Sequence, residues 1–270
     1  MTEHSVWDSA FAGPALRRFA GCALQPQSLQ ALLQEVLPQV AEMAKGQSPL
    51  LIGHHNLFSL HLQQRDPEVA AFYRQCERCY VDGVPVLWLL RAAGFDTRGA
   101  QRFSLMDCLP QLFDAAQAQG LRVFYLGSED TAVQRARRWV AREWPGLAIA
   151  WQHGYCDDDA AVVAAINDFR PQLLLVGMGM PKQEQWILRH CGQLRAGAIL
   201  QAGGTLDYYT GLQARPPAVF SRLGLGWLYR LLHNPGRLWR RYLLTPWTLL
   251  HPTLRLRREL RAERGLPRGT

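Results

Sequence analysis

The sequence predicts an α/β protein with a Rossmann-like, doubly wound and mainly parallel sheet, followed by a helical, basic C-terminal appendage. Short apolar runs typical of buried parallel strands alternate with stretches of helical periodicity. The strands expected in the second half of the chain all stop at glycine, as strands of βα units often do. After Asp207 this alternation ends, and leucine, tryptophan and arginine become prominent.

The elements are expected in a regular order. The first 25 residues lack clear periodicity and are expected to form an arm or edge element. Helices are expected where apolar residues have helical spacing: 28–45, 57–76, 84–93, 109–119, 131–144, 160–170 and 182–190. Strands are expected at short apolar runs bounded by turn residues: 50–52, 78–81, 122–126, 148–152, 173–176 and 198–201.

The change in pattern near residues 210–220 predicts three regions. They are an N-terminal arm and helix (1–45), a Rossmann-like body (46–215) and a basic amphipathic appendage (216–270). Between Arg222 and Thr270 lie eleven arginines and two glutamates, although the whole chain has a net charge of only +8. The body is therefore close to neutral, and the basicity indicates an attachment surface on the appendage.

The appendage interleaves these arginines with tryptophan and leucine, which favours an interfacial membrane helix. A nucleic-acid arm and a core-packing helix with a solvated basic side are the alternatives. No apolar run reaches the ~20 residues needed to span a bilayer. The opening residues lack the apolar segment of a signal peptide. A cytoplasmic protein with reduced cysteines is expected. Cys76 and Cys79 are interpreted as structural thiols, with a metal or redox site as the alternative.

Glycine-rich loops follow several of the expected strands. Because the carboxyl ends of parallel strands share one edge of a sheet, these loops are expected to line one crevice. A nucleotide diphosphate suits such a crevice, held by backbone N–H groups, a helix N-terminus and a lysine. Tight structural turns are the alternative interpretation. The candidate binding residues are Gly127, Ser128, Gly154, Gly177, Gly179, Pro181, Lys182, Gly203 and Gly204.

Polar residues at other strand ends could carry chemistry. Asp82 ends a strand in Tyr-Val-Asp-Gly, where it is either a general base or a turn residue. His54, His55 and Asn56 are expected to line the crevice rather than bind a metal. The acids at 157–159 are expected to decorate a helix N-terminus, with a divalent metal as the alternative.

Together these residues resemble the WecG/TagA/CpsF glycosyltransferases, known as glycosyltransferase family 26. The resemblance covers about residues 48–243. It rests on the Asn56 loop and on the blocks YVDGVPVLWLLR (80–91), FYLGS (124–128), PQLLLVGMGMPKQEQWI (171–187), GAILQAGGTLDYYTGLQARPP (197–217) and GLGWLYRLLHNPGRLWRRYL (224–243).

The resemblance implies an inverting enzyme that moves a sugar from a UDP-sugar to a polyprenyl-diphosphate-linked saccharide in bacterial surface polysaccharide biosynthesis. Asp82 matches the proposed base, Arg102 a candidate for binding diphosphate and Gln183 a residue near the donor. Asn56 and Asp207 join the expected binding residues. Arg230, Arg237 and Arg240 would hold diphosphates at the membrane, on the inner face of which the protein is expected to be peripheral. No metal cofactor and no nucleic acid are expected, and a homo-oligomer is compatible with the sequence.

Four positions depart from the family pattern. His54 stands where threonine is usual, Pro85 replaces the second glycine of DGxG, Leu105 precedes Asp107 in a loop that usually has glycine, and Gly226 replaces glutamate. The changes at His54 and Leu105 indicate an atypical substrate or, alternatively, a weakened enzyme. The rival functions are a non-catalytic nucleotide-binding scaffold or regulator and a nucleic-acid-binding protein.

Overall fold

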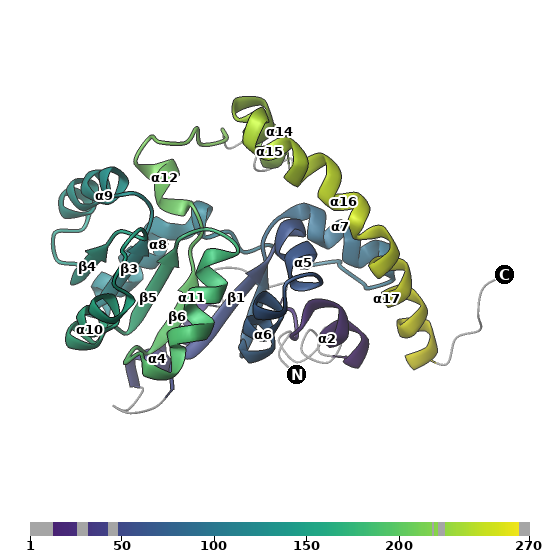
Figure 1. Cartoon of the computed structure of the whole chain (residues 1–270), viewed down its shortest axis with the longest axis horizontal. Coiled ribbons are helices and arrows are strands. Elements are labelled where there is room, and N and C mark those ends of the chain that lie inside the picture. Colours follow the sequence, from purple (N-terminus) through teal and green to yellow (C-terminus); the bar gives the residue numbers. More distant parts are fainter. Residues whose placement is uncertain (1–12, 26–31, 43–47, 218, 221–224, 265–270) are drawn as a thin grey trace. The chain divides into compact units, whose positions relative to one another are not determined.

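The computed structural model describes residues 13–25, 32–42, 48–217, 219–220 and 225–264 (Figure 1). Within these ranges the chain forms a six-stranded, all-parallel sheet flanked by helices, with strand order β2-β1-β6-β5-β3-β4. The Rossmann-like α/β class predicted from the sequence is confirmed. The strands are β1 (Leu50–His55), β2 (Arg78–Val81), β3 (Val123–Gly127), β4 (Ile149–Gln152), β5 (Leu173–Gly177) and β6 (Ala198–Gln201).

The central strands are apolar along their whole length because both of their faces are covered. Every residue of β3, β5 and β6 is buried. Covered parallel strands have this continuous pattern, whereas a strand with one wet face alternates polar and apolar residues. Strand β3 pairs with β5 in a register that places Gly127 opposite Gly177. The two glycine-bearing strand ends therefore lie next to each other.

The chain divides into two compact units. The second unit, Ser28–Gly53 and Ser104–Arg215, contains β3 to β6 and the first residues of β1. Its helices are η1 (Leu32–Val36), α4 (Leu37–Glu42), α8 (Leu105–Ala118), α9 (Asp130–Glu143), α10 (Asp159–Phe169), α11 (Lys182–His190), η2 (Cys191–Gln193) and α12 (Thr205–Tyr209). Helix α11 begins a few residues after β5, and α12 begins shortly after β6.

The first unit joins three stretches that are distant in sequence: Met1–Gln27, His54–Phe103 and Pro216–Thr270. Its helices are α2 (Pro14–Ala20), α5 (Leu57–Gln63), α6 (Pro67–Gln75), α7 (Val84–Ala93), α14 (Gly226–His233), α15 (Pro235–Trp239), η3 (Arg240–Leu244), α16 (Thr245–Thr248) and α17 (Leu250–Glu263). Helix α17 packs against α2 and α7, burying Leu256 and Leu260 (Figure 1). The Glu263 carboxylate also accepts a hydrogen bond from the Ala15 amide at 3.0 Å.

Three elements differ from the sequence expectation. The N-terminal arm contains helix α2, which ends at Gly21 with φ of 79°. The helix expected over 57–76 is two helices, because Asp66 caps a new helix and Pro67 opens it. Helix α8 begins at Leu105, four residues earlier than expected, and contains Pro110 within its length. Residues 28–31 and 43–45 of the helix expected over 28–45 lie outside the described residues.

Substitution of Gly177 tests how tightly the strand ends pack. A Cβ there would lie 2.2 Å from the Tyr125 hydroxyl and 2.8 Å from the Gly203 carbonyl oxygen. We therefore expect Gly177→Ala to lower the free energy of unfolding by about 1–3 kcal/mol, the usual cost of overpacking. Gly192→Ala is the matched control, since a Cβ at Gly192 meets nothing within 4 Å. Urea unfolding of both variants measures the difference, and equal midpoints would contradict this packing.

Candidate active site

Glycines at three strand ends in the second unit are required by the packing of the loops themselves. A Cβ on Gly127 would lie 2.3 Å from the Gly177 carbonyl carbon, and one on Gly154 would lie 2.9 Å from the Gly127 Cα. Gly177 is constrained in the same way by Tyr125. Close packing at the strand ends therefore requires glycine at all three positions, whether or not a ligand also binds there.

Two other glycines face open space. Gly179 has φ of 79° and Gly203 has φ of 52°, and a Cβ on either would meet no atom within 4 Å. Both residues adopt backbone angles that L side chains rarely take, and both leave room beside the backbone. At neighbouring Gly204 a Cβ would approach the Asp207 carboxylate to 3.3 Å. Asp207 itself accepts a hydrogen bond from the Gln213 side chain at 2.9 Å.

Lys182 links the start of α11 to the loop after β4. Its Nζ donates to the Gly154 carbonyl at 2.6 Å and lies 4.5 Å from the centre of the Tyr155 ring. Pro181 precedes it as the N-cap of α11. The ammonium group and the N-terminal end of α11 give this part of the second unit a positive potential, which suits an anion.

Gln183 lies behind the Gly203 loop. The side chain is fully buried, and its Oε1 accepts a hydrogen bond from the Gly203 amide at 3.0 Å. Its Nε2 donates to Glu184 Oε1 at 2.8 Å, and the Gln201 side chain donates to the same carboxylate oxygen. Gln183 therefore holds the Gly203 backbone in place, a role that the sequence alone did not indicate.

Ser128 is also turned inward. It is nearly buried, has φ of 56°, and its Oγ lies 3.0 Å from the Tyr125 hydroxyl. Burial raises the pKa of Tyr125 far above its usual range, against the opposing effect of the Ser128 hydrogen bond. Tyr125 is therefore neutral at physiological pH, and its hydroxyl is hydrogen-bonded to Ser128 at the end of β3.

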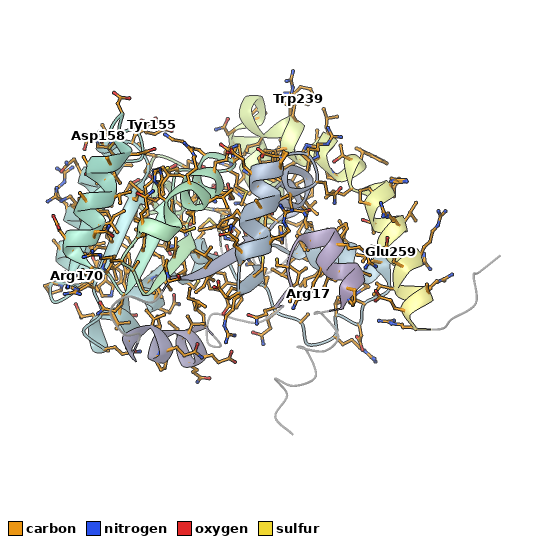
Figure 2. The ribbon with its side chains drawn as sticks, turned by 60° about the horizontal axis from the view of Figure 1, so that its bottom comes forward. Arg17, Tyr155, Asp158, Arg170, Trp239 and Glu259 are labelled. Carbon is orange, nitrogen blue, oxygen red and sulfur yellow. The ribbon has the colours of Figure 1, made fainter. Side chains whose placement is uncertain are left out.

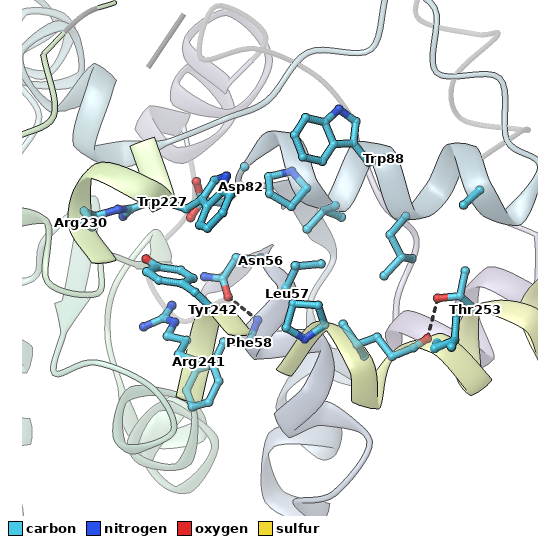
Figure 3. A pocket seen from close by; sticks show the side chains of 18 residues that line it. Asn56, Leu57, Phe58, Asp82, Trp88, Trp227, Arg230, Arg241, Tyr242 and Thr253 are labelled. Carbon is cyan, nitrogen blue, oxygen red and sulfur yellow. Dashed lines mark hydrogen bonds between the residues drawn. The ribbon is translucent and has the colours of Figure 1, made fainter. Parts of the chain in front are cut away.

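In the first unit, Asn56 and Asp82 line a hollow of about 450 Å³ (Figure 3). The Asp82 amide donates to the His55 carbonyl at 2.8 Å, which fixes the backbone at the end of β2. Gly83 follows with φ of 99°, an angle that favours glycine, and Pro85 lies in the first turn of α7. The tight turn and the inward-facing carboxylate are thus both present at Asp82.

Asn56 caps helix α5 as well as lining the hollow. Its Oδ1 accepts hydrogen bonds from the Phe58 and Ser59 amides at 3.0 and 3.1 Å, and the Ser59 hydroxyl accepts one from the Asn56 amide. This capping box starts α5. The capping contacts use only the carbonyl oxygen of the Asn56 side chain.

Two arginines of the C-terminal region line the hollow together with Trp227 and Tyr242. They are Arg230, which the sequence predicted, and Arg241, which it did not. The Arg241 guanidinium lies 4.7 Å from the centre of the Phe58 ring. Arg240 lies outside the lining and stacks on Trp239 at 5.3 Å, and the side chain of Arg237 lies outside the described structure.

Arg102, His54 and His55 differ in their burial and in their polar contacts. Arg102, in the segment after α7, is half-buried and lies outside the lining of the hollow. Burial lowers the pKa of His54, against the charge of Asp82, while His55 and Arg241 lower it further. His54 is therefore neutral at physiological pH. His55 is fully buried, with its Nε2 2.8 Å from the Ala20 carbonyl and its Nδ1 3.0 Å from the Ser59 hydroxyl.

One group of possible metal ligands occurs among the described residues. Cys22, His55 and Cys79 are buried, and their ligand atoms lie within 4.8 Å of one another. A hydrogen bond from the Cys79 thiol lowers the pKa of Cys22 to about 6 despite burial, and burial raises the pKa of Cys79. Both His55 nitrogens also have protein partners, the Ser59 hydroxyl and the Ala20 carbonyl. The sequence could not pair Cys79 with the distant Cys22.

Two of the acids at 157–159 have structural partners. Asp158 caps α10 by accepting from the Ala161 amide at 3.0 Å. Asp159 accepts from the Trp186 indole at 2.7 Å and lies 3.2 Å from His190 Nε2. These contacts tie the start of α10 to α11, in agreement with the expected decoration of a helix N-terminus.

The exposed apolar side chains concentrate in the C-terminal region. Trp247 is 74% exposed and Leu232 is 68% exposed. Trp239, Leu243 and Leu244 are also exposed, and Figure 2 shows Trp239 pointing away from the ribbon. Over the described part of the chain, no helix combines the length and apolar character that crossing a membrane requires.

Comparison with known proteins identifies relatives. A family model described as "Glycosyl transferase WecG/TagA/CpsF family" matches residues 19–263. Proteins of Staphylococcus aureus strains MW2 and NCTC 8325 / PS 47 are each 33% identical over 142 residues, and that of strain MRSA252 is 32% identical. All three are named N-acetylglucosaminyldiphosphoundecaprenol N-acetyl-beta-D-mannosaminyltransferase. Each match covers 52% of this chain and 56% of the relative, so the chain spans about half the length of these relatives.

Substitution of Asn56 tests its role as the cap of α5. Asn56→Ala removes the cap of α5, and we expect it to lower the free energy of unfolding by about 0.5–2 kcal/mol. Asn56→Asp keeps an acceptor oxygen at the same place, so its stability should remain within about 0.5 kcal/mol of the native chain. Thermal unfolding measures both. Equal losses in the two variants would show that the cap does not determine stability here.

Proposed function

Because the chain belongs to the WecG/TagA/CpsF family of glycosyl transferases, we propose that it transfers a sugar, with inversion, from a UDP-sugar to a saccharide on polyprenyl diphosphate. The observation that carries the proposal is the position of Asp82, whose side chain lines the same hollow as Arg230 and Arg241. A carboxylate base beside two cations suits an acceptor that has both a hydroxyl group and a diphosphate. The names of the Staphylococcus aureus relatives support this acceptor class, and bacterial surface polysaccharide synthesis is the corresponding process.

The donor is assigned to the second unit. The open backbone at Gly179 and Gly203 and the N-terminal end of α11 offer an anion site for the UDP diphosphate. Lys182 supplies a positive charge beside it, and the exposed Tyr155 ring offers a stacking surface. Gln183 acts indirectly in this proposal, by holding the Gly203 amide. The relatives' names make N-acetylmannosamine the first donor sugar to test.

The proposed reaction is a single displacement. The acceptor hydroxyl oxygen attacks the anomeric carbon of the donor, and its proton passes to the Asp82 carboxylate. The bond between that carbon and the UDP oxygen breaks, and UDP leaves with the bonding electrons. Backbone N–H groups and cationic side chains offset the charge on the leaving diphosphate, the role that metal ions have in many transferases.

Membrane attachment through the C-terminal region is a second part of the proposal. The exposed leucine and tryptophan side chains lie among arginines, and this combination enters the head-group zone of anionic bilayers. A protein acting on a lipid-linked acceptor would then be peripheral on the inner face of the plasma membrane.

Asp82→Asn tests the proposed base. Loss of the proton acceptor should lower kcat by about 100-fold or more, while UDP affinity remains unchanged because the change alters none of the residues proposed to hold UDP. Asp168→Asn, an exposed change on α10, is the control. Transfer to a polyprenyl-diphosphate-linked N-acetylglucosamine and calorimetric UDP titration measure the two quantities. A native chain that binds UDP without transferring a sugar would overturn the proposal in favour of a non-catalytic homologue.

Trp247→Ser tests attachment to membranes. Since Trp247 is 74% exposed, the change should leave folding intact and weaken binding to anionic vesicles several-fold. Leu212→Ser removes an exposed apolar side chain from the second unit and should leave vesicle binding unchanged. Vesicle flotation at low and high salt measures the affinity. Equal behaviour of the two variants would place attachment elsewhere.

A further inference from the structure

Three side chains that can bind a metal ion gather in the first unit, outside the lining of the hollow. Cys22 follows helix α2, His55 ends strand β1 and Cys79 lies in strand β2. All three are buried, and one ligand atom from each lies within 4.8 Å of the other two. The fold thus brings two thiols and an imidazole together from three separate elements.

The backbone around this cluster is held by hydrogen bonds. The Gln25 amide donates to the Cys79 carbonyl at 2.7 Å, where residue 25 forms a parallel bridge to β2. The Asp82 amide donates to the His55 carbonyl at 2.8 Å, and the His55 ring stacks on Tyr73 with ring centres 3.9 Å apart. The segments that carry the three side chains are therefore already in place, which lowers the cost of assembling a binding site.

The hydrogen bonds of His55 allow one ring nitrogen to act as a ligand. The Ser59 hydroxyl donates to the Asn56 carbonyl at 2.8 Å, so Ser59 Oγ can accept from His55 Nδ1 at 3.0 Å. With the ring hydrogen on Nδ1, Nε2 presents its lone pair beside the Ala20 carbonyl oxygen, 2.8 Å away. Two acceptors this close require an added proton or a metal ion between them. An outer hydrogen bond that fixes the tautomer is usual for histidine ligands of metals.

We propose that Cys22, Cys79 and His55 bind one zinc ion. The Ala20 carbonyl oxygen, 3.6 Å from Cys22 Sγ, supplies a fourth donor. Sulfur and nitrogen ligands with four positions filled are typical of structural zinc sites. On binding, each cysteine thiol releases its proton to solvent and coordinates as a thiolate.

Charge favours zinc over other soft metal ions at this position. Two thiolates balance a divalent cation, so the complete site is neutral and suits a buried place. Monovalent copper also prefers thiolates, but it would leave a net negative charge away from water. The Cys22 and Cys79 thiols already share a hydrogen bond, and the ion replaces the proton between them.

The distances leave room for such an ion. Zinc–sulfur bonds of about 2.3 Å and zinc–nitrogen bonds of about 2.0–2.1 Å place the ligand atoms of a tetrahedral site roughly 3.4–3.8 Å apart. The three ligand atoms lie within 4.8 Å of one another, so small side-chain rotations complete the contraction. Neither the backbone nor the pairing of the strands has to change.

The ligand set differs from the one that sequence spacing suggests. Cys76 and Cys79 have the spacing of many zinc and redox motifs, but Cys76 lies outside the cluster. Its Sγ donates to the Phe72 carbonyl at 3.5 Å. With Cys22 as ligand, the ion fastens the residues after α2 to strands β1 and β2. This role is structural and does not depend on the proposed sugar transfer.

Metal analysis of the purified full chain tests the site. After expression with zinc and purification under reducing conditions, elemental mass spectrometry should find one zinc ion per chain. Cobalt(II) added to chelator-treated protein should give thiolate-to-metal charge-transfer absorption and the visible bands of a tetrahedral ion. A chain that binds neither metal, or that binds cobalt without thiolate absorption, would overturn the proposal.

Single substitutions identify the ligands. Cys22→Ser and Cys79→Ser should each weaken zinc binding by about 100-fold or more, since loss of an outer hydrogen-bond partner alone costs about 10–100-fold. Cys191→Ser, a half-buried cysteine of the second unit, is the matched control and should leave the affinity unchanged. Competition with a chromophoric chelator measures the affinity. Weaker binding in Cys76→Ser but not in Cys22→Ser would overturn the proposed ligand set.

Thermal unfolding with and without zinc separates a bound ion from a cluster held by hydrogen bonds alone. Zinc sulfate should raise the Tm of the chelator-treated native chain and of Cys191→Ser by several degrees, and should leave that of Cys22→Ser unchanged. Because each protein is compared with itself, a less stable variant does not obscure the result. A disulfide between Cys22 and Cys79, with no zinc bound after its reduction, would overturn the proposal and identify a redox pair instead.

Discussion

Burial of the sheet on both faces is the constraint on which the rest of the structure depends. A strand such as β5 has no solvated face, so polar chemistry can only begin where the chain leaves the strand. In the second unit this brings Gly177, Gly179 and Lys182 together within a few residues. In the first unit the same constraint places Asn56 directly after β1 and Asp82 directly after β2.

Because the sheet is covered on both faces, the polar side chains of Gln183, Glu184 and Gln201 are buried together. Polar groups that leave water must find partners, and here each amide donates to one carboxylate oxygen. The remaining acceptor of Gln183 is used by the Gly203 amide. A backbone segment with left-handed φ and open space beside it is thereby held from behind. Rigid support of this kind is what a loop needs if its backbone is to bind an anion without reorganising.

The sequence predicted the strands well because continuous apolar runs leave few alternatives to buried strands. The sequence could not show which glycines lack room for a Cβ and which face open space, since contacts between distant loops decide this. The family resemblance pointed to Arg240, whereas Arg241 lines the hollow. Residues 240–244 form a π-helical turn, which changes the face on which successive side chains lie relative to an α-helix. The burial of Gln183 was equally hidden, because polar residues at a helix start usually face water.

Core packing, one of the roles that the sequence left open for the C-terminal region, holds for part of it. Helix α17 is a packing element, since Leu256 and Leu260 are buried. Packing does not account for the segment just before it, however. Seven of the eleven exposed large apolar side chains among the described residues lie between Leu232 and Leu254. Such a concentration of exposed apolar side chains is unusual on a monomer surface, and with its arginine neighbours it supports the proposed attachment to anionic membranes. The hollow presents the same pairing on a smaller scale, with Arg230 and Arg241 beside apolar walls.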